Sequence, residues 1–231
     1  MAYKHILLDN DGTLMDFVMA QEKALENVYK ASPLSAILPW SPYILECYDK
    51  ANKAWWAKLE RGECNKAELQ LGRFYDFFEL IGLLGDAEEF NTNYMTELGK
   101  GQYLIEGALD VVKALSEKYP LYITTNGVAK TQHNRIDTCE FAPFITKLYV
   151  SEETGFAKPK KEYFDYVMND IGDTDPAHYI IVGDSLASDI KGARNAGIDS
   201  IWYNPEGLDN PENIPVTHEI KDIKELLTIL L

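Results

Sequence analysis

From about residue 107 onward, short apolar runs alternate with segments of helical length. Each run is rich in β-branched or aromatic residues and has a polar exit, which is typical of a short buried strand. The predicted strands are Leu121–Thr125, Lys147–Val150, Tyr179–Val182 and Ser200–Tyr203. The predicted helices are Ala108–Lys118, Ala129–Thr138, Lys161–Ile171, Leu186–Ala196 and Lys221–Leu230. Such an alternation predicts a parallel α/β sheet covered by helices.

One more run of this kind, Tyr3–Leu8, is separated from the others by a long segment without a convincing strand. Within that segment, apolar and aromatic residues recur at spacings of three and four, and Pro or Gly residues interrupt the pattern. This predicts three or four helices packed as a small bundle. We therefore expect a Rossmann-like α/β core at residues 1–16 and 101–231, with a helical cap at residues 17–100 inserted after the first strand. Residues 204–215 are expected to form a loop before the last helix.

Composition excludes several classes of function. The chain has 231 residues and a formal net charge of -15, which would repel a nucleic-acid polymer or an anionic membrane. No apolar run is long enough to span a bilayer or to form a signal-peptide core, so we expect a cytoplasmic protein. The three cysteines show no paired spacing and are expected to be reduced thiols. A monomer and a homodimer both remain open.

The first predicted strand runs into Asp9-Asn10-Asp11-Gly12-Thr13. Residues two apart share a face of a strand, so this spacing would direct the carboxylates of Asp9 and Asp11 toward one point. That point lies at the carboxyl edge of the sheet, where open α/β folds bind ligands. An EF-hand calcium loop is excluded, because its first and last ligand positions would fall on Leu7 and Val18.

Three further polar groups follow predicted strands in chain order. Thr124-Thr125-Asn126-Gly127 ends the second strand and leads into a helix, whose N-terminal N–H groups favour anions. Lys158 stands before a proline at the start of a later helix and supplies a compact positive charge. Asp184 follows the Tyr179–Val182 strand, with Asp189 five residues later. Taken singly, such residues are usually solvated side chains, but their repeated position at strand ends favours one shared site.

The ordered set DNDGT, TTNG, AKP and GDSLASD resembles the haloacid dehalogenase superfamily of hydrolases, and the helical insertion resembles its helical-cap subgroup. The resemblance implies a magnesium-dependent phosphomonoester hydrolase. Asp9 would attack phosphorus and form an aspartyl-phosphate that water then hydrolyses. Asp11 would act first as the general acid and then as the general base.

The resemblance also implies the roles of the other residues. Mg²⁺ would be held by the Asp9 carboxylate, the Asp11 main-chain carbonyl and Asp184, with Asp189 behind them. Thr125 and neighbouring main-chain amides would hold a phosphoryl oxygen, although a one-residue shift in register would exchange Thr125 with Thr124. Lys158 would offset the charge of Asp9 and the phosphate. Asn126 and Gly127 would also contact the substrate and complete the expected phosphate site.

A phenylalanine soon after DNDGTL, the TTNG sequence and the run VSEETGFAKPKKEYFDYV resemble the pyrimidine 5'-nucleotidase branch. The implied substrate is a small phosphorylated metabolite, specifically a nucleoside 5'-monophosphate. Phe17 would then lie on the substrate side of the catalytic loop. Arg61 and Lys66 flank a predicted turn in the cap that either selects the substrate or is a solvated surface turn.

Alternative functions are a general phosphatase for sugar phosphates or phosphoglycolate, or a phosphomutase. The acid at Asp11 argues against a carbon-halogen hydrolase, because a halide leaves without a proton. A phosphate-accepting signalling or binding module is an alternative of another class. Catalytic turnover of a small phosphomonoester with magnesium would exclude that class.

Overall fold

The computed structural model describes residues 3–231, apart from the side chain of Glu60. Six strands form one sheet in the order β3-β2-β1-β4-β5-β6, and every neighbouring pair is parallel. The strands are β1 (His5–Leu8), β2 (Leu121–Thr125), β3 (Lys147–Val150), β4 (Tyr179–Gly183), β5 (Asp199–Tyr203) and β6 (His218–Ile220). The predicted parallel α/β architecture is therefore confirmed.

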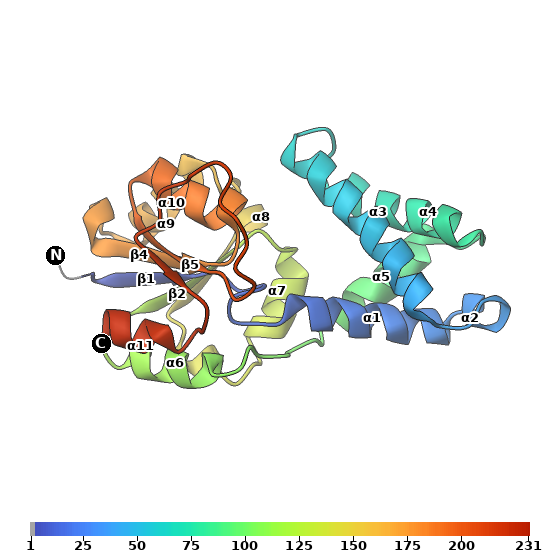
Figure 1. The fold of residues 1–231 in the computed structure, drawn as a ribbon, viewed down its shortest axis with the longest axis horizontal. Helices are drawn as coiled ribbons and strands as arrows, with labels where there is room; N and C mark the ends of the chain where they lie inside the picture. Colours follow the sequence, from blue (N-terminus) through green and yellow to red (C-terminus); the bar gives the residue numbers. More distant parts are fainter. Residues whose placement is uncertain (1–2) are drawn as a thin grey trace. The chain divides into compact units, whose positions relative to one another are not determined.

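Helices cover both faces of this sheet, as Figure 1 shows. One face packs against α9 (Lys161–Ile171) and α10 (Lys191–Ala196). The other packs against α6 (Ala108–Ser116), α7 (Ala129–Ile136) and α11 (Glu225–Leu230). The remaining short helices of this unit are η1 (Ala142–Phe144), α8 (Ser151–Thr154), η2 (Pro176–His178) and η3 (Leu186–Ile190). Alternate residues of β1 supply both apolar cores, because Leu7 packs on one side and Ile6 and Leu8 on the other.

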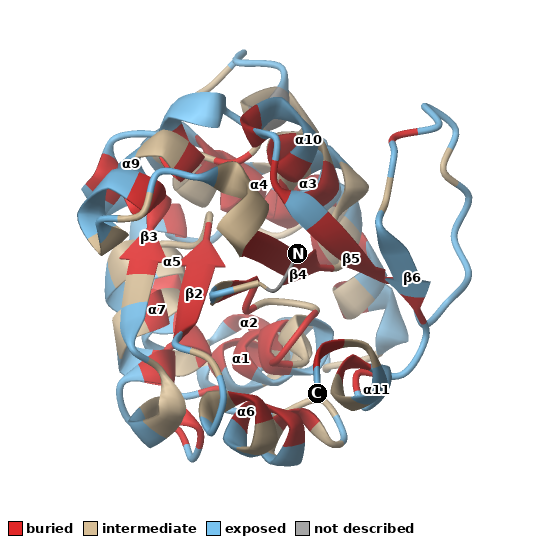
Figure 2. Cartoon of the chain, turned by 90° about the vertical axis from the view of Figure 1, so that its left-hand side faces the viewer, coloured by how far each residue is buried: buried red, intermediate tan, exposed pale blue. Residues whose placement is uncertain are grey.

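The central strand β1 positions the site. Strand β1 pairs with β2 on one side and with β4 on the other. The order of the strands along the chain therefore reverses its direction across the sheet at β1. In open α/β sheets, ligands bind at the carboxyl ends of the strands beside such a switch point. Figure 2 shows the buried strands lying between partly exposed helices. The polar residues that directly follow these strands range from buried Asp9 to partly exposed Asn126 and Asp184.

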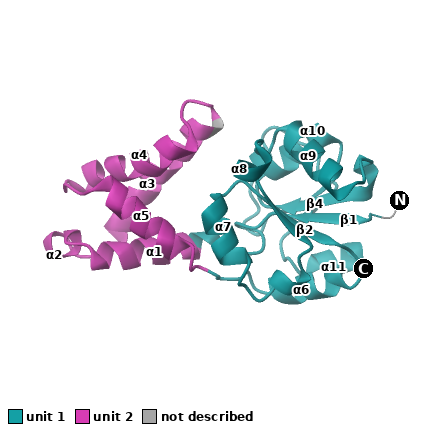
Figure 3. Ribbon diagram, turned by 180° about the vertical axis from the view of Figure 1, so that it is seen from behind, with its two compact units in different colours: residues 1–18, 102–231 teal, residues 19–101 magenta. Residues whose placement is uncertain are grey.

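Residues 19–101 form a second compact unit, and residues 1–18 and 102–231 form the first (Figure 3). The helices of the insertion are α1 (Phe17–Ala31), α2 (Leu34–Ile37), α3 (Pro42–Glu60), α4 (Lys66–Ile81) and α5 (Ala87–Leu98). Buried aromatic rings fill the second unit, with Phe74 and Phe77 fully enclosed and Tyr48 stacked on Phe74. These rings pack the bundle and do not form an open stacking surface.

The insertion holds five helices where three or four are predicted, and in the core unit β6 and the helix after β4 also differ from the prediction. Strand β6 lies between the predicted loop and the last helix, and α11 begins at Glu225. β6 has three residues of which the first two are exposed, so it lacks the apolar run of the other strands. The helix predicted from Leu186 is divided into the π-helical turn η3 and α10. Ser185 caps this wide turn, and Asp189 within it is buried.

Across residues 3–231, no helix combines the length and the apolar character needed to cross a membrane. Cys47, Cys64 and Cys139 are free thiols, as their spacing predicts.

Candidate active site

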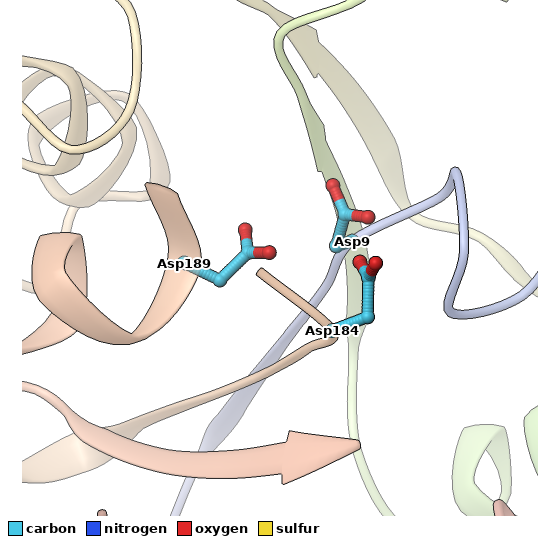
Figure 4. A group of neighbouring side chains, drawn as sticks. All are labelled: Asp9, Asp184 and Asp189. Carbon is cyan, nitrogen blue, oxygen red and sulfur yellow. The ribbon is translucent and has the colours of Figure 1, made fainter. Parts of the chain in front are cut away.

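Three carboxylates converge at the carboxyl edge of the sheet (Figure 4). Asp9 directly follows β1, Asp184 directly follows β4, and Asp189 lies in η3. Each residue offers one carboxylate oxygen, and these three oxygen atoms lie within 4.8 Å of one another. β1 and β4 are paired in register from His5 to Leu8, and the Asp9 N–H donates to the carbonyl of Val182 at 2.8 Å. The pairing of two parallel strands therefore brings Asp9 and Asp184 together.

Lys158 is the cation of this cluster. Its ammonium donates to Asp9 Oδ1 and to Asp189 Oδ1, both at 2.6 Å, and to the Thr124 carbonyl at 2.7 Å. The side chains of Lys158 and Asp189 are each only 1% exposed. All three protons of the ammonium are thus directed to oxygen atoms, which fixes its position. The ammonium of Lys158 can be buried because its three partners are two carboxylates and a main-chain carbonyl.

The electrostatics of the cluster are dominated by its burial. Burial raises the pKa of Asp9 well above its ordinary value, and Asp189 and Asp184 raise it further against the effect of Lys158. Burial, and then the charge of Asp189, raises the pKa of Asp184 to about 7. Burial alone would lower the pKa of Lys158, but the charges of Asp189 and Asp9 outweigh it and the pKa is raised. Lys158 therefore stays cationic, whereas Asp9 and Asp184 resist ionisation.

These donors fit a hard divalent cation. When ionised, three carboxylates against one ammonium leave two excess negative charges in a largely buried volume. Burial is the main cause of the raised pKa values of Asp9 and Asp184, and the neighbouring carboxylates raise them further. Carboxylate oxygen is the ligand type that Mg²⁺ prefers, and a dication would neutralise the excess.

Two loop residues close the cluster. The Thr13 hydroxyl donates to Asp184 Oδ1 at 3.3 Å and lies 3.5 Å from Asp9 Oδ2. Gly12 has a φ of +88°, and a Cβ atom there would lie 2.5 Å from Asp184 Oδ2. Glycine is therefore required at this position both by the backbone conformation and by the close approach of Asp184.

We expect Gly12→Ala to disturb the acidic cluster more than its backbone strain alone explains. Gly172→Ala is the matched control, because Gly172 has a φ of +85° with no atom within 4 Å of an added Cβ. Both variants should lose roughly 1–2 kcal/mol of unfolding free energy from the left-handed backbone. Only Gly12→Ala should also weaken divalent-cation binding, by about tenfold or more, as measured by calorimetric titration. Equal cation affinities in the two variants would show that the contact with Asp184 is unimportant.

The end of β2 places the TTNG residues beside Lys158. The Asn126 side chain donates to the Lys158 carbonyl at 2.8 Å and accepts from the Lys158 N–H at 3.0 Å. The Thr125 hydroxyl accepts from the Gly127 N–H at 3.0 Å, which leaves its own proton to donate. A Cβ on Gly127 would lie 2.2 Å from the Gln132 amide. Asn126 thus binds the main chain that carries Lys158, which the sequence did not predict.

The N-terminus of α7 was expected to offer N–H groups to an anion. In the structure the Ala129 N–H donates to Glu152 Oε2 at 2.8 Å. A carboxylate of the protein itself therefore uses one of these donors, in accord with the preference of helix N-termini for negative charge.

We expected the carboxylates of Asp9 and Asp11 to point to one place. The Asp11 carboxylate is instead outside the Asp9–Asp184–Asp189 cluster and has different hydrogen-bond partners. Arg135 on α7 donates to Asp11 Oδ1 in a short ion pair, and the Gln132 amide donates to Asp11 Oδ2 at 2.6 Å. The reason is that β1 ends at Leu8, so the alternation of a strand no longer applies at Asp11. Gln132 and Arg135 were not predicted, although their spacing of three places them on one face of a helix that follows TTNG.

The remaining predicted residues fall in different places. Phe17 is partly buried, and the Arg135 guanidinium lies over its ring at 5.7 Å from the centroid. Arg61 is exposed and pairs through two nitrogens with Glu63, at 2.6 and 2.7 Å. Lys66 begins α4, which Asn65 caps. Arg61 and Lys66 belong to residues 19–101, so they lie in the other compact unit from Asp9.

The chain is similar to known hydrolases along nearly its whole length. The family model of the haloacid dehalogenase-like hydrolases matches residues 3–197. The chain is 37% identical to the HAD-hydrolase YfnB of Bacillus subtilis, over 99% of this chain and 95% of that protein. A crystal structure of YfnB bound to magnesium superposes with a TM-score of 0.92, at 36% identity, covering 100% of this chain and 99% of YfnB.

Two other relatives are pyrimidine 5'-nucleotidases. PynA of Streptococcus pneumoniae is 33% identical over 100% of this chain and 96% of its own length. YjjG of Escherichia coli is 29% identical over 100% of this chain and 99% of its own length. The family model spans most of the chain, and the relatives match it from end to end. The chain is therefore a member of the haloacid dehalogenase-like hydrolase family.

Proposed function

We propose that this hydrolase is a phosphatase of nucleoside 5'-monophosphates that acts through an aspartyl-phosphate on Asp9. One observation carries the proposal. A buried carboxylate at the end of the central strand is held by Lys158 and lies beside Asp184, in a chain that is similar along its whole length to pyrimidine 5'-nucleotidases. Such an edge can accept an anion only if positive charge outweighs the repulsion between carboxylate and phosphate.

Asp9 is the nucleophile in this proposal. Its Oδ2 is free of Lys158, which binds Oδ1, and that oxygen forms the bond to phosphorus as the bond to the leaving oxygen breaks. Asp11 gives its proton to the leaving oxygen and afterwards takes a proton from the water that attacks the aspartyl-phosphate. Lys158 stays cationic throughout, because two carboxylates raise its pKa.

Asp9, Asp184 and the main-chain carbonyl of Asp11 are the proposed ligands of Mg²⁺. When bound, the ion supplies positive charge that offsets the phosphate and the carboxylates. Two unit charges of like sign at about 4 Å repel by roughly 4 kcal/mol at an effective dielectric constant of 20, so Lys158 alone would not suffice against a phosphate dianion. Asp189 holds Lys158 at 2.6 Å and remains behind the proposed ligands.

The loop after β2 is the proposed seat of the phosphoryl oxygens. The Thr125 hydroxyl retains a proton to donate, since it already accepts from Gly127. Asn126 fixes the main chain of Lys158 through two hydrogen bonds, so we assign it a positioning role in addition to any phosphate contact through Gly127. Donors fixed in this way need little reorganisation when charge develops on the phosphate.

Substrate choice is proposed from the relatives and from the residues around the catalytic loop. PynA and YjjG are pyrimidine 5'-nucleotidases by name, and each matches the whole chain. Phe17, Arg61 and Lys66 are the proposed contacts of the nucleoside. Of these, Phe17 lies against Arg135, the ion-pair partner of Asp11.

A substrate screen tests the proposal. Purified protein with Mg²⁺ should release phosphate over many turnovers, with kcat/KM for pyrimidine nucleoside 5'-monophosphates at least about tenfold above that for hexose phosphates or phosphoglycolate. Phe17→Ala should reduce this preference, whereas Tyr166→Ala, at an exposed aromatic residue on α9, should not. Equal rates on all phosphomonoesters would favour a general phosphatase. A single phosphate per chain would favour a signalling module.

The pKa of Asp184 predicts a pH-dependent response to Mg²⁺. An acid whose pKa is raised in the folded state contributes stability below its ordinary pKa, and this contribution is lost as the pH rises through the folded-state pKa. Stability without metal should therefore fall between about pH 4 and about pH 7 on account of Asp184. Mg²⁺ requires the ionised carboxylate, so it should raise the melting temperature more at about pH 8 than at about pH 6. Thermal melts of the wild type and of Asp184→Asn check this, and an equal shift at both pH values would contradict it.

A further inference from the structure

Gln132 and Arg135 form a pair on α7 that we name the α7 clamp. Arg135 is fully buried, Gln132 is 2% exposed, and they bind opposite oxygens of the same Asp11 carboxylate. The Asp11 side chain itself is 21% exposed. A partly exposed acid is thus held by two buried donors. This geometry fixes both oxygens, so the carboxylate cannot turn without breaking a bond to the clamp.

The clamp is in turn braced by its own neighbours. The Gln132 carbonyl oxygen accepts from the Asn10 amide at 2.8 Å, next to Asp11 in the chain. A Cβ on Gly127 would lie 2.2 Å from Gln132 Nε2, so glycine in the TTNG turn leaves room for this side chain. The Arg135 guanidinium also lies over the Phe17 ring. Four segments of the core unit therefore converge on the orientation of one carboxylate.

From this convergence we propose that Gln132 and Arg135 are positioning residues for proton transfer by Asp11. The inference rests on the proposed function, in which Asp11 is the acid and the base. Neither residue of the clamp need touch the substrate. Its effect is to keep the carboxyl group aimed at the leaving oxygen, and then at the attacking water, because a misplaced acid transfers protons poorly.

Charge explains why Asp11 stays with the clamp. If Asp11 turned away, the fully buried guanidinium would lose its carboxylate partner. Breaking a buried ion pair in this way is strongly unfavourable. While the Asp11 carboxyl group accepts from the clamp, its oxygens keep further lone pairs. Asp11 can therefore carry or accept the transferred proton without breaking its hydrogen bonds to the clamp.

In the first step the proton passes from Asp11 to the bridging oxygen as the P–O bond breaks and the bond to Asp9 forms. In the second step a water proton passes to Asp11 as the water oxygen attacks phosphorus and the bond to Asp9 breaks.

The leaving group distinguishes positioning of an acid from a general structural role. A nucleoside leaves as a poorly stabilised alkoxide and needs the proton, whereas p-nitrophenolate leaves without one. Arg135→Met should therefore slow first-turnover release of a nucleoside from its 5'-monophosphate by roughly 100-fold. First-turnover release of p-nitrophenolate from p-nitrophenyl phosphate should change by less than about fivefold, followed by slow turnover, because the second step still needs the base.

The experiment measures both first-turnover rates by rapid quench and stopped flow with Mg²⁺. Arg135→Lys keeps the charge but not the planar fork and should recover part of the nucleoside rate. Gln132→Met keeps the ion pair and should show the same selectivity with a smaller loss, which serves if Arg135→Met folds poorly. Arg194→Met, an exposed arginine on α10, should match the wild type. The KM for the nucleotide should stay within about threefold in all variants, because uniform binding is untouched.

Selective loss on the nucleotide, with recovery by Arg135→Lys, supports the clamp. Equal loss on both substrates in folded protein overturns it, because the pair would then act on the whole site. Unchanged rates for Arg135→Met and Gln132→Met also overturn it. A wild-type protein that hydrolyses neither substrate would overturn the proposed function itself, and the clamp with it.

Discussion

Replacing Asp9 by Asn is expected to abolish turnover while leaving the protein folded. The amide cannot form the proposed covalent bond to phosphorus, so phosphate release should fall by roughly 10⁴-fold or more. The melting temperature without metal should stay the same or rise, because the ionised Asp9 is disfavoured in its buried position beside Asp184 and Asp189. Steady-state phosphate release and a thermal melt measure the two effects.

Asp209→Asn is the matched control, because Asp209 is an exposed carboxylate in the loop after β5. It makes the same chemical change outside the cluster and should alter neither activity nor stability measurably. A folded Asp9→Asn protein that retains turnover would contradict the assignment of the nucleophile. A marked loss of stability would instead contradict the electrostatic account of the cluster.

The second large effect is expected from Lys158→Met. Removing the ammonium leaves Asp9 and Asp189 buried without their shared cation, and breaking a buried ion pair in this way costs roughly 3–5 kcal/mol. For a chain of this size the melting temperature should fall by about 10 °C. Activity should fall by roughly 10²–10³-fold, because a charge that offsets the phosphate is lost. Lys160→Met, at an exposed position two residues further along, should change neither quantity.

A double variant separates the two effects of Lys158. In Lys158→Met with Asp189→Asn, one of the two unpaired acids is removed, so part of the stability should return. Activity should not return, because Asp9 still lacks its cation. If the double variant were no more stable than Lys158→Met, the loss would arise from packing and not from unpaired charge. If its activity recovered, Lys158 would have no role with the phosphate.

The position of Asp9 and Asp184 could be predicted from the sequence because it follows from the sheet. Both residues come directly after apolar runs, and parallel strands end at the same edge. Only the position of Lys158 within the ordered set of motifs DNDGT, TTNG, AKP and GDSLASD predicted that it would lie near Asp9 and Asp184. Its ammonium reaches Asp9 across 149 positions of sequence, a contact that no local pattern encodes.

The α7 clamp could not be predicted for the opposite reason. The sequence AKTQHNRI is strongly polar and is typical of an exposed helix, yet Thr131, Gln132 and Arg135 are buried. Burial of Gln132 and Arg135 is favourable only because Asp11 and Asn10 provide partners, and these partners are far away in sequence. The strand β6 was missed because His218 and Glu219 are exposed, so the segment carries no apolar run. Tertiary partners, not local preference, determine both features.

Chemical trapping of the covalent intermediate tests the central claim most directly. Protein incubated with substrate and Mg²⁺ is treated with borohydride, which reduces an aspartyl-phosphate to homoserine, and its peptides are analysed by mass spectrometry. The Asp11→Asn variant with p-nitrophenyl phosphate is the best material, because its second step lacks the base. We predict homoserine at position 9, dependent on substrate and absent from Asp9→Asn. Reduction at another acid, or none while phosphate is released, would contradict the account.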